Sequence, residues 1–304
     1  MLTVCNYHYI RESYFSEYPS IFGVTPNGFK NQLKLLKKTG CFITPSQLVE
    51  DYDAVVSSKY NYFCITFDDG LKEQFEFALP ILQELDIQAF FFANSINTEM
   101  QKVCTVHKIH LLRSILSPEK LMYLLKKKST FSLNEVEIKN GEGHYRYDTP
   151  ESAQLKYLLN FKIPFDIQEQ IIDIVFNSYF DEEVVLNKLY MSKEELIYLG
   201  KNNNLGSHTH THYPLGLLEI DKLRYELEHS KMYFEALVGN VITAVAYPYG
   251  TDEACTGLVA ETAKKVGYLY GFTTKRGIID RSNNKLLLNR FDCNDLIGGK
   301  SYSK

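Results

Sequence analysis

The strongest constraint on the fold is an alternation of strand-like and helix-like segments, which holds at both ends of the chain and stops in its middle. Short runs rich in aromatic and β-branched residues predict strands, at residues 2–6, 41–44, 60–67, 88–93, 242–247, 268–273 and 286–288. Apolar residues at helical spacing predict helices between them, at residues 25–40, 72–85, 192–203, 219–238 and 253–266. Repeated strand–helix units predict an α/β fold with a parallel sheet, open or closed into a barrel.

The middle of the chain, residues 95–190, carries helical patterns without a strong strand signal. Helices are predicted there at residues 121–127, 152–159 and 167–176, with a polar, glycine-containing stretch at 139–149. We therefore predict that residues 1–94 and 191–304 build one barrel domain and that residues 95–190 form a mostly helical insertion. Loops at the carboxyl ends of barrel strands often select the substrate, so we expect the insertion near the mouth of the site.

The composition argues against several classes of protein. A formal net charge of −4 gives no sign of a basic surface for nucleic acid. No stretch approaches the roughly 18 apolar residues of a membrane span, and the N-terminus lacks the basic start and apolar run of a signal peptide. The cysteines are scattered without a Cys-x-x-Cys pair, which argues against a zinc ribbon or a thioredoxin-like site. A cytoplasmic protein is the simplest interpretation.

Two adjacent carboxylates, Asp68 and Asp69, follow the strongest predicted strand. They would repel each other in a partly buried place, and a bound cation would remove that conflict. In parallel α/β folds, functional residues gather at this end of the strands. Taken alone, the segment is equally compatible with a polar turn that uses Asp-Gly chemistry.

A second segment gathers three of the eight histidines of the chain, His208, His210 and His212. Neutral imidazoles are good ligands for zinc and related metals, and a turn in this loop would let His208 and His212 reach one ion. In a tight loop the ring of His210 would point elsewhere, so it is not expected to be a ligand. One carboxylate and two imidazoles leave a position open for water, as catalytic zinc sites do. The alternative is a solvated, histidine-rich loop.

A third segment, residues 246–250, follows a predicted strand, and its proline and glycine fix a tight loop. Such a loop can aim a backbone N–H at a developing oxyanion, although a plain turn explains this segment better when it is taken alone.

In their order and context, the three segments resemble the motifs of the polysaccharide deacetylases with a NodB homology domain, also called carbohydrate esterase family 4. The Asp68-Asp69 pair is similar to the first motif, residues 208–212 to the second, and residues 248–250 to the third. The resemblance covers residues 1–94 and 192–295. It implies a distorted (β/α)7-type barrel that holds a divalent metal ion, usually zinc.

By position, the resemblance implies that Asp69, His208 and His212 bind the metal and that Asp68 is the general base that acts on water. It also implies that the backbone N–H of Tyr249 helps to hold the oxyanion. These roles agree with elementary chemistry, because a metal lowers the pKa of water and polarises an amide carbonyl, and the neighbouring carboxylate takes the proton.

The chain departs from the family pattern in two places. The third motif usually has an arginine two residues before its proline, where this chain has Ala246. That arginine orients the catalytic aspartate, and Arg290 is a candidate to replace it. The late Leu-x-His motif, which supplies the catalytic acid, is absent. The last histidine of the chain, His229, lies on a charged helix face, where a solvated role is expected.

The start of the chain offers a replacement for the missing acid. Residues 6–10 resemble the Tyr-His segment that opens the poly-N-acetylglucosamine deacetylases, a permuted branch of the family. The resemblance implies that His8 protonates the leaving amine, and we expect it to face the metal from the side opposite Asp68. Asp292 is a candidate to hold the ring of His8. The alternative for His8 is a buried histidine bonded to the backbone.

The function expected from these observations is the metal-dependent removal of an N-acetyl group from a carbohydrate in glycan biosynthesis. A cytoplasmic enzyme would act on a nucleotide-linked, lipid-linked or small soluble sugar, and a secreted one on a finished polymer. Two alternatives stay open: a deformylase or other amidase acting on a sugar, and a catalytically silent carbohydrate-binding protein. The lost motif arginine favours the silent protein, whereas the paired aspartates and the two histidines favour the enzyme.

Overall fold

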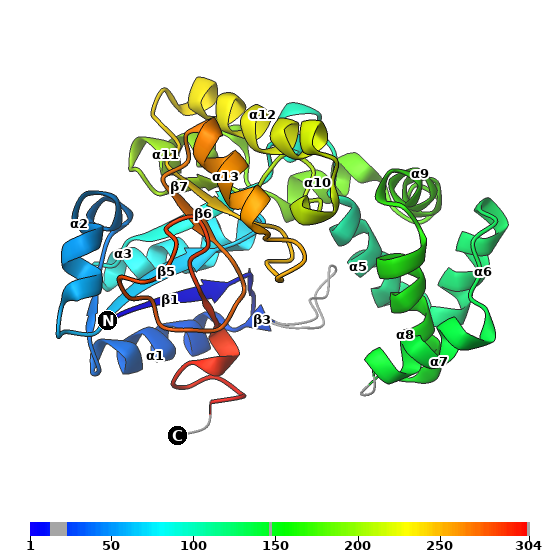
Figure 1. The fold of residues 1–304 in the computed structure, drawn as a ribbon, viewed down its shortest axis with the longest axis horizontal. Helices are drawn as coiled ribbons and strands as arrows, with labels where there is room; N and C mark the ends of the chain where they lie inside the picture. Colours follow the sequence, from blue (N-terminus) through cyan, green and yellow to red (C-terminus); the bar gives the residue numbers. More distant parts are fainter. Residues whose placement is uncertain (13–22, 146–147, 303–304) are drawn as a thin grey trace. The chain divides into compact units, whose positions relative to one another are not determined.

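The computed structural model describes residues 1–12, 23–145 and 148–302, which divide into two compact units. The first unit contains the sheet and is formed by residues 1–12, 23–101 and 187–302. The second unit, residues 102–186, contains only helices among the residues described (Figure 1). None of the described helices is long and apolar enough to span a membrane.

Parallel strands build a curled sheet in the first unit (Figure 1). The main path of the sheet runs in the order β10-β1-β5-β6-β7-β8-β9, and the short β4 pairs with the start of β5. The bounds are Leu2–Tyr7 (β1), Cys41–Phe42 (β4), Tyr62–Phe67 (β5), Ala89–Ala93 (β6), Leu205–Ser207 (β7), Ala244–Ala246 (β8), Tyr270–Phe272 (β9) and Phe291–Asp292 (β10). Tyr9–Ile10 (β2) and Gly23–Val24 (β3) pair separately. The predicted α/β fold of the distorted seven-stranded barrel type is confirmed.

The helices of the first unit mostly connect consecutive strands. Their bounds are Pro26–Lys37 (α1), Pro45–Ser57 (α2), Leu79–Glu84 (α3), Ser95–Glu99 (α4), Lys193–Lys201 (α11), Ile220–Val238 (α12) and Gly257–Val266 (α13). Local sequence explains where several of them begin and end. The Thr25 side chain accepts the N–H of Gly28, and Pro26 starts α1 with its φ already set for a helix. Gly239, with φ of 75°, ends α12 in the left-handed conformation that glycine adopts without strain.

The sheet is buried on both faces, as β6 shows. Phe91 of this strand belongs to a core cluster that also contains residues of α1, α11, α12 and α13. Its neighbours Phe90 and Phe92 point to the other face, into a cluster that includes side chains of α2. Alternate residues of a strand point to opposite faces, so three consecutive phenylalanines suit a strand that is covered on both sides.

The helices of the second unit confirm the helical patterns predicted there. They are Thr105–Ile115 (α5), Pro118–Lys128 (α6), Glu135–His144 (α7), Pro150–Tyr157 (α8) and Phe165–Phe176 (α9), followed by Glu182–Leu189 (α10), which continues into the first unit. Lys108 is buried and lies 2.6 Å from Asp173 and 2.7 Å from Glu182. These two ion pairs connect α5, α9 and α10.

The structure corrects some local predictions and refines others. The strand predicted at 286–288 is reduced to one bridge between Leu288 and Phe272, and the last strand is β10, whose two residues are too short to give a pattern. Helix α2 was not predicted. The helix predicted over 72–85 contains a π-helical stretch, Gln74–Ala78, before α3. The polar stretch that starts at residue 139 lies partly in α7, which a capping box at Asn134 begins.

Candidate metal and catalytic site

The candidate site residues lie at the carboxyl ends of neighbouring strands. His8 follows β1, Asp68 and Asp69 follow β5, and His208 follows β7. Strands β1 and β5 pair with Tyr7 opposite Phe67, so His8 and Asp68 leave the sheet side by side. Strand β6 lies between β5 and β7 and aligns their ends. Because parallel strands end at a common edge, segments far apart in the sequence meet there.

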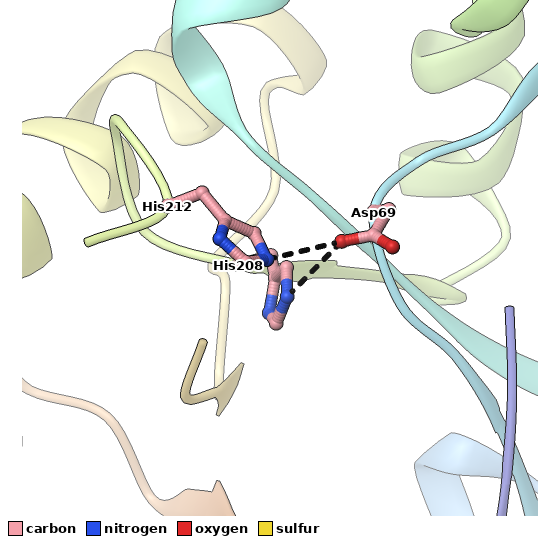
Figure 2. Close-up of side chains that lie close together, drawn as sticks. All are labelled: Asp69, His208 and His212. Carbon is pink, nitrogen blue, oxygen red and sulfur yellow. Dashed lines mark ion pairs between the residues drawn. The ribbon is translucent and has the colours of Figure 1, made fainter. Parts of the chain in front are cut away.

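Asp69, His208 and His212 form a buried cluster at this edge (Figure 2). The Asp69 Oδ1 atom lies 3.4 Å from Nε2 of His208 and 3.3 Å from Nε2 of His212. A tetrahedral ion with bonds of about 2.0–2.1 Å separates its ligand atoms by about 3.3 Å, so these spacings fit one ion. The chemistry of the donors, one carboxylate and two imidazoles, also fits a divalent metal.

A backbone hydrogen bond on the ring nitrogen farther from Asp69 fixes the orientation of the His208 ring. Its Nδ1 donates a 2.7 Å hydrogen bond to the backbone oxygen of Ala246, which leaves Nε2 to face Asp69. Carbonyl partners of this kind set the tautomer of metal-binding histidines. Burial opposes protonation of His208, but the nearby Asp68 and Asp69 carboxylates raise its pKa above the usual value. The same negative charge favours a cation in this place.

The loops of the site depart from ordinary backbone conformations. Asp69, His212 and Tyr249 have φ angles of 77°, 67° and 64°, although none of them is glycine. Such conformations cost about 1–3 kcal/mol each and persist only where the surroundings impose them, often at functional sites. Gly70 follows with φ of 62°, and a Cβ there would lie 2.8 Å from that of Ala93. The turn after β5 therefore needs glycine beside the two aspartates.

The loop of residues 208–212 is held by a residue that the sequence did not reveal, Glu226 of α12. Its buried carboxylate accepts hydrogen bonds from the backbone N–H of His210 at 3.1 Å and of Thr211 at 2.8 Å. It also accepts a 2.6 Å hydrogen bond from the Thr211 hydroxyl. Asn94 also donates a hydrogen bond to the loop, to the backbone oxygen of His208. Three donors on one carboxylate fix the path of the loop between its two candidate ligands.

Asp68 is paired with Arg290, the residue considered as a replacement for the missing motif arginine. Nη1 and Nη2 of Arg290 each donate a 2.7 Å hydrogen bond to one carboxylate oxygen, and Asn6 donates a third bond at 3.2 Å. Both partners are almost fully buried. Burial by itself raises the pKa of Asp68, but the charges of Arg290 and His208 outweigh it and lower the pKa to about 2. Asp68 is therefore ionised at neutral pH.

His8 lies beside Asp68, whereas we expected it to face the metal from the side opposite Asp68. Its Nε2 is 3.8 Å from Oδ2 of Asp68, and 36% of its side chain is exposed. The register of β1 and β5 explains this position, because it makes His8 and Asp68 neighbours. Asp292 does not contact His8 among the described residues; its carboxylate accepts 2.8 Å hydrogen bonds from the backbone and side-chain nitrogens of Asn294. It caps the 3₁₀ turn Cys293–Asp295.

The loop after β8 reaches the same site through Tyr249. Its ring contacts that of His212 edge to face, with centroids 5.4 Å apart. The Thr274 hydroxyl donates a 3.0 Å hydrogen bond to the backbone oxygen of Tyr249 and anchors the loop. Unlike His208 and His212, which face Asp69, His210 is hydrogen-bonded through its Nδ1 to Ser95 Oγ at 2.7 Å.

Comparison with known proteins finds similarity to one family model and to several solved structures. Residues 189–271, which include the histidine loop and the loop after β8, match the family model described as polysaccharide deacetylase. This part of the chain is therefore similar to the polysaccharide deacetylase family. No curated protein sequence matches the chain.

Solved structures of deacetylases share the fold over nearly the whole chain. The Streptococcus pyogenes deacetylase PplD in complex with acetate is 18% identical, with a TM-score of 0.59 over 96% of this chain and 91% of that one. IcaB from Ammonifex degensii is 17% identical, with a TM-score of 0.58 over 95% of this chain and 90% of that one. A de-N-acetylase from Aggregatibacter actinomycetemcomitans is 12% identical, with a TM-score of 0.55 over 96% and 95%.

Proposed function

We propose that this chain is a metal-dependent hydrolase that removes the N-acetyl group from a carbohydrate. The observation that carries the proposal is the pairing of a metal-type cluster, Asp69, His208 and His212, with a separately held carboxylate, Asp68. A catalytic metal site needs an open position and a nearby base, and this arrangement provides for both. A shared fold with PplD, whose structure contains acetate, supports acetate as the product.

Asp69, His208 and His212 would hold the metal, and zinc suits their two nitrogens and one oxygen. When bound, a divalent ion supplies Lewis-acid chemistry: it lowers the pKa of water and polarises the amide carbonyl. The three side chains are almost fully buried, which keeps most bulk water away from the cluster. His212 and Asp69 keep their strained backbones because the histidine loop and the β5 turn are anchored elsewhere.

Asp68 would act as the general base. It is ionised, and Arg290 and Asn6 hold its carboxylate in one orientation. His8 would act as the general acid for the amine, since it lies 3.8 Å from Asp68 and is the more exposed of the two. A proton taken by Asp68 and a proton given by His8 complete the hydrolysis, and acetate and the free amine leave. The backbone N–H of Tyr249 would help to stabilise the oxyanion.

The experiment that tests this proposal is an assay of acetate release by the purified protein. The substrates are N-acetylated chito-oligosaccharides, nucleotide-linked N-acetyl sugars and lipid-linked N-acetyl sugars, with Asp68→Asn as the matched inactive control. We expect acetate from at least one class and none from the control. Formate from N-formyl sugars without acetate from any substrate would favour the deformylase. Carbohydrate binding without release of either acid would favour the silent binding protein.

A further inference from the structure

A second group of metal-type side chains lies in the first unit, outside the catalytic cluster. It consists of Glu99 at the end of α4, His210 in the histidine loop and His229 on α12. Their candidate ligand atoms all lie within 4.8 Å of one another. We propose that these three residues bind a second divalent transition-metal ion, with zinc as the expected occupant. This proposal does not depend on the deacetylase activity.

The distances leave room for one ion after small side-chain movements. Oε2 of Glu99 lies 2.8 Å from Nε2 of His229 and 3.8 Å from Nδ1 of His210. These values lie on either side of the separation of about 3.3 Å between ligands of a tetrahedral ion. The shorter contact is a hydrogen bond between Glu99 and His229, in which an ion would take the place of the shared proton.

Aromatic packing holds the two imidazoles next to each other. The ring centroids of His210 and His229 are 4.6 Å apart and the rings are 77° from parallel. Tyr225 stacks on His229 at 4.7 Å and meets His210 edge to face at 5.7 Å. Both rings are thus fixed before a ligand arrives, which lowers the entropy cost of binding.

The exposure of the group suits binding of an ion from solvent. His210 is buried, while about a third of the side chains of His229 and Glu99 is exposed, 32% and 29%. An ion could therefore enter from solvent and keep water as its remaining ligand. Zinc held by two imidazoles and one carboxylate is a common protein arrangement.

Ser95 is the competitor for the site, since its hydroxyl is hydrogen-bonded to Nδ1 of His210 at 2.7 Å. Binding through this nitrogen requires that hydrogen bond to break. The backbone N–H of Ser95 donates separately to the oxygen of Thr209 at 3.3 Å, and an alanine would keep this bond. Ser95→Ala should therefore bind zinc at least as tightly as the protein with Ser95. A Glu99–His229 pair that serves only to stabilise the fold would bind no zinc in either protein.

The test counts zinc in protein purified without a histidine tag, in a background where the first cluster is disabled by His212→Ala. After equilibrium dialysis against zinc, we expect about one equivalent in this background and also in His212→Ala/Ser95→Ala. His212→Ala/His229→Gln should lose that equivalent, because glutamine can keep the hydrogen bond to Glu99 but is a poor zinc ligand. His212→Ala/His144→Gln, altered in the second unit, is the matched control and should keep it.

In the same His212→Ala background, cobalt absorption gives a second measurement. Tetrahedral coordination of the bound cobalt should produce visible bands that vanish when His229→Gln is added. If His212→Ala fails to fold, Asp69→Asn provides the alternative background. The proposal is overturned if neither background binds zinc, or if His229→Gln leaves the stoichiometry unchanged. The readout of this test is metal content. A negative result would therefore say nothing about acetate release by the wild-type protein, which is measured separately.

Discussion

Arg290 and Asp68 form two parallel hydrogen bonds of 2.7 Å, although 222 residues separate them in the sequence. The sheet order explains the contact, because β10 follows Arg290 and lies beside β1, and β1 lies beside β5. The arginine of the third family motif would stand at position 246, where this chain has alanine. The backbone carbonyl of Ala246 accepts a hydrogen bond from Nδ1 of His208. The fold thus brings an arginine to Asp68, the proposed base, from the segment just before β10.

Replacement of Arg290 should therefore affect both activity and stability. Arg290→Met leaves Asp68 buried without its counter-charge, which typically costs about 3–5 kcal/mol. We expect a lower free energy of unfolding and a fall in kcat on the order of 100-fold or more, since the base loses its orientation. Denaturant unfolding and acetate release measure the two effects.

The double variant Arg290→Met/Asp68→Asn separates the two contributions. It removes both charges, so we expect the free energy of unfolding to recover most of the loss seen in Arg290→Met. The activity should stay low because the base is gone. Equal stability of the single and double variants would mean that the ion pair is not what Arg290 contributes.

Asp68→Asn should retain metal and lose activity. Asparagine keeps one acceptor oxygen for Arg290 but cannot take a proton at neutral pH, and a positioned base typically contributes about 100- to 10,000-fold. We expect unchanged metal content by elemental analysis and a kcat lowered within that range. An Asp68→Asn enzyme within a few fold of the wild type would show that another group is the base.

The sequence predicted the candidate metal ligands better than the residues that hold them in place, and the reasons are physical. Asp69 and His208 lie within two residues of the ends of β5 and β7, so the pattern of strands was enough to bring them to one edge. His212 lies farther along the loop after β7, and its place depends on the path of that loop. Glu226 lies on a helix rich in charged residues, where a buried acceptor looks the same as a solvated one. The position of His8 depends on the register of β1 and β5, which follows from the pairing of strands and not from their composition.

The removal of a proposed metal ligand should change metal content in a countable way. His212→Ala removes one nitrogen from the cluster with Asp69 and His208, so we expect about one equivalent of metal fewer than in the wild type after dialysis. Thermal unfolding should also occur at a lower temperature than in the metal-loaded wild type, because an ion that binds only the folded state stabilises it. The assignment fails if His212→Ala holds as much metal as the wild type.

Glu226 should act on the site through the histidine loop. Glu226→Ala leaves the N–H groups of His210 and Thr211 without their acceptor, and each such loss costs about 1–3 kcal/mol. We expect weaker metal binding by about 10- to 100-fold, as for other groups that orient ligands. Glu226→Gln keeps one acceptor oxygen and should lie between the alanine variant and the wild type. A purely structural role would lower stability and leave the metal dissociation constant of the folded protein unchanged.

His8→Ala should leave metal content intact and lower kcat on an acetamide substrate by about 100- to 10,000-fold. Amide hydrolysis needs an acid, since an unprotonated amine anion is a very poor leaving group. An activated acetyl ester has a leaving group that needs no proton, so the same variant should lose much less activity on it. The position of His8, 3.8 Å from Asp68, allows a different role, in which it only supports the base. In that case amide and ester hydrolysis would fall by the same factor, and the ratio of the two kcat values decides between the roles.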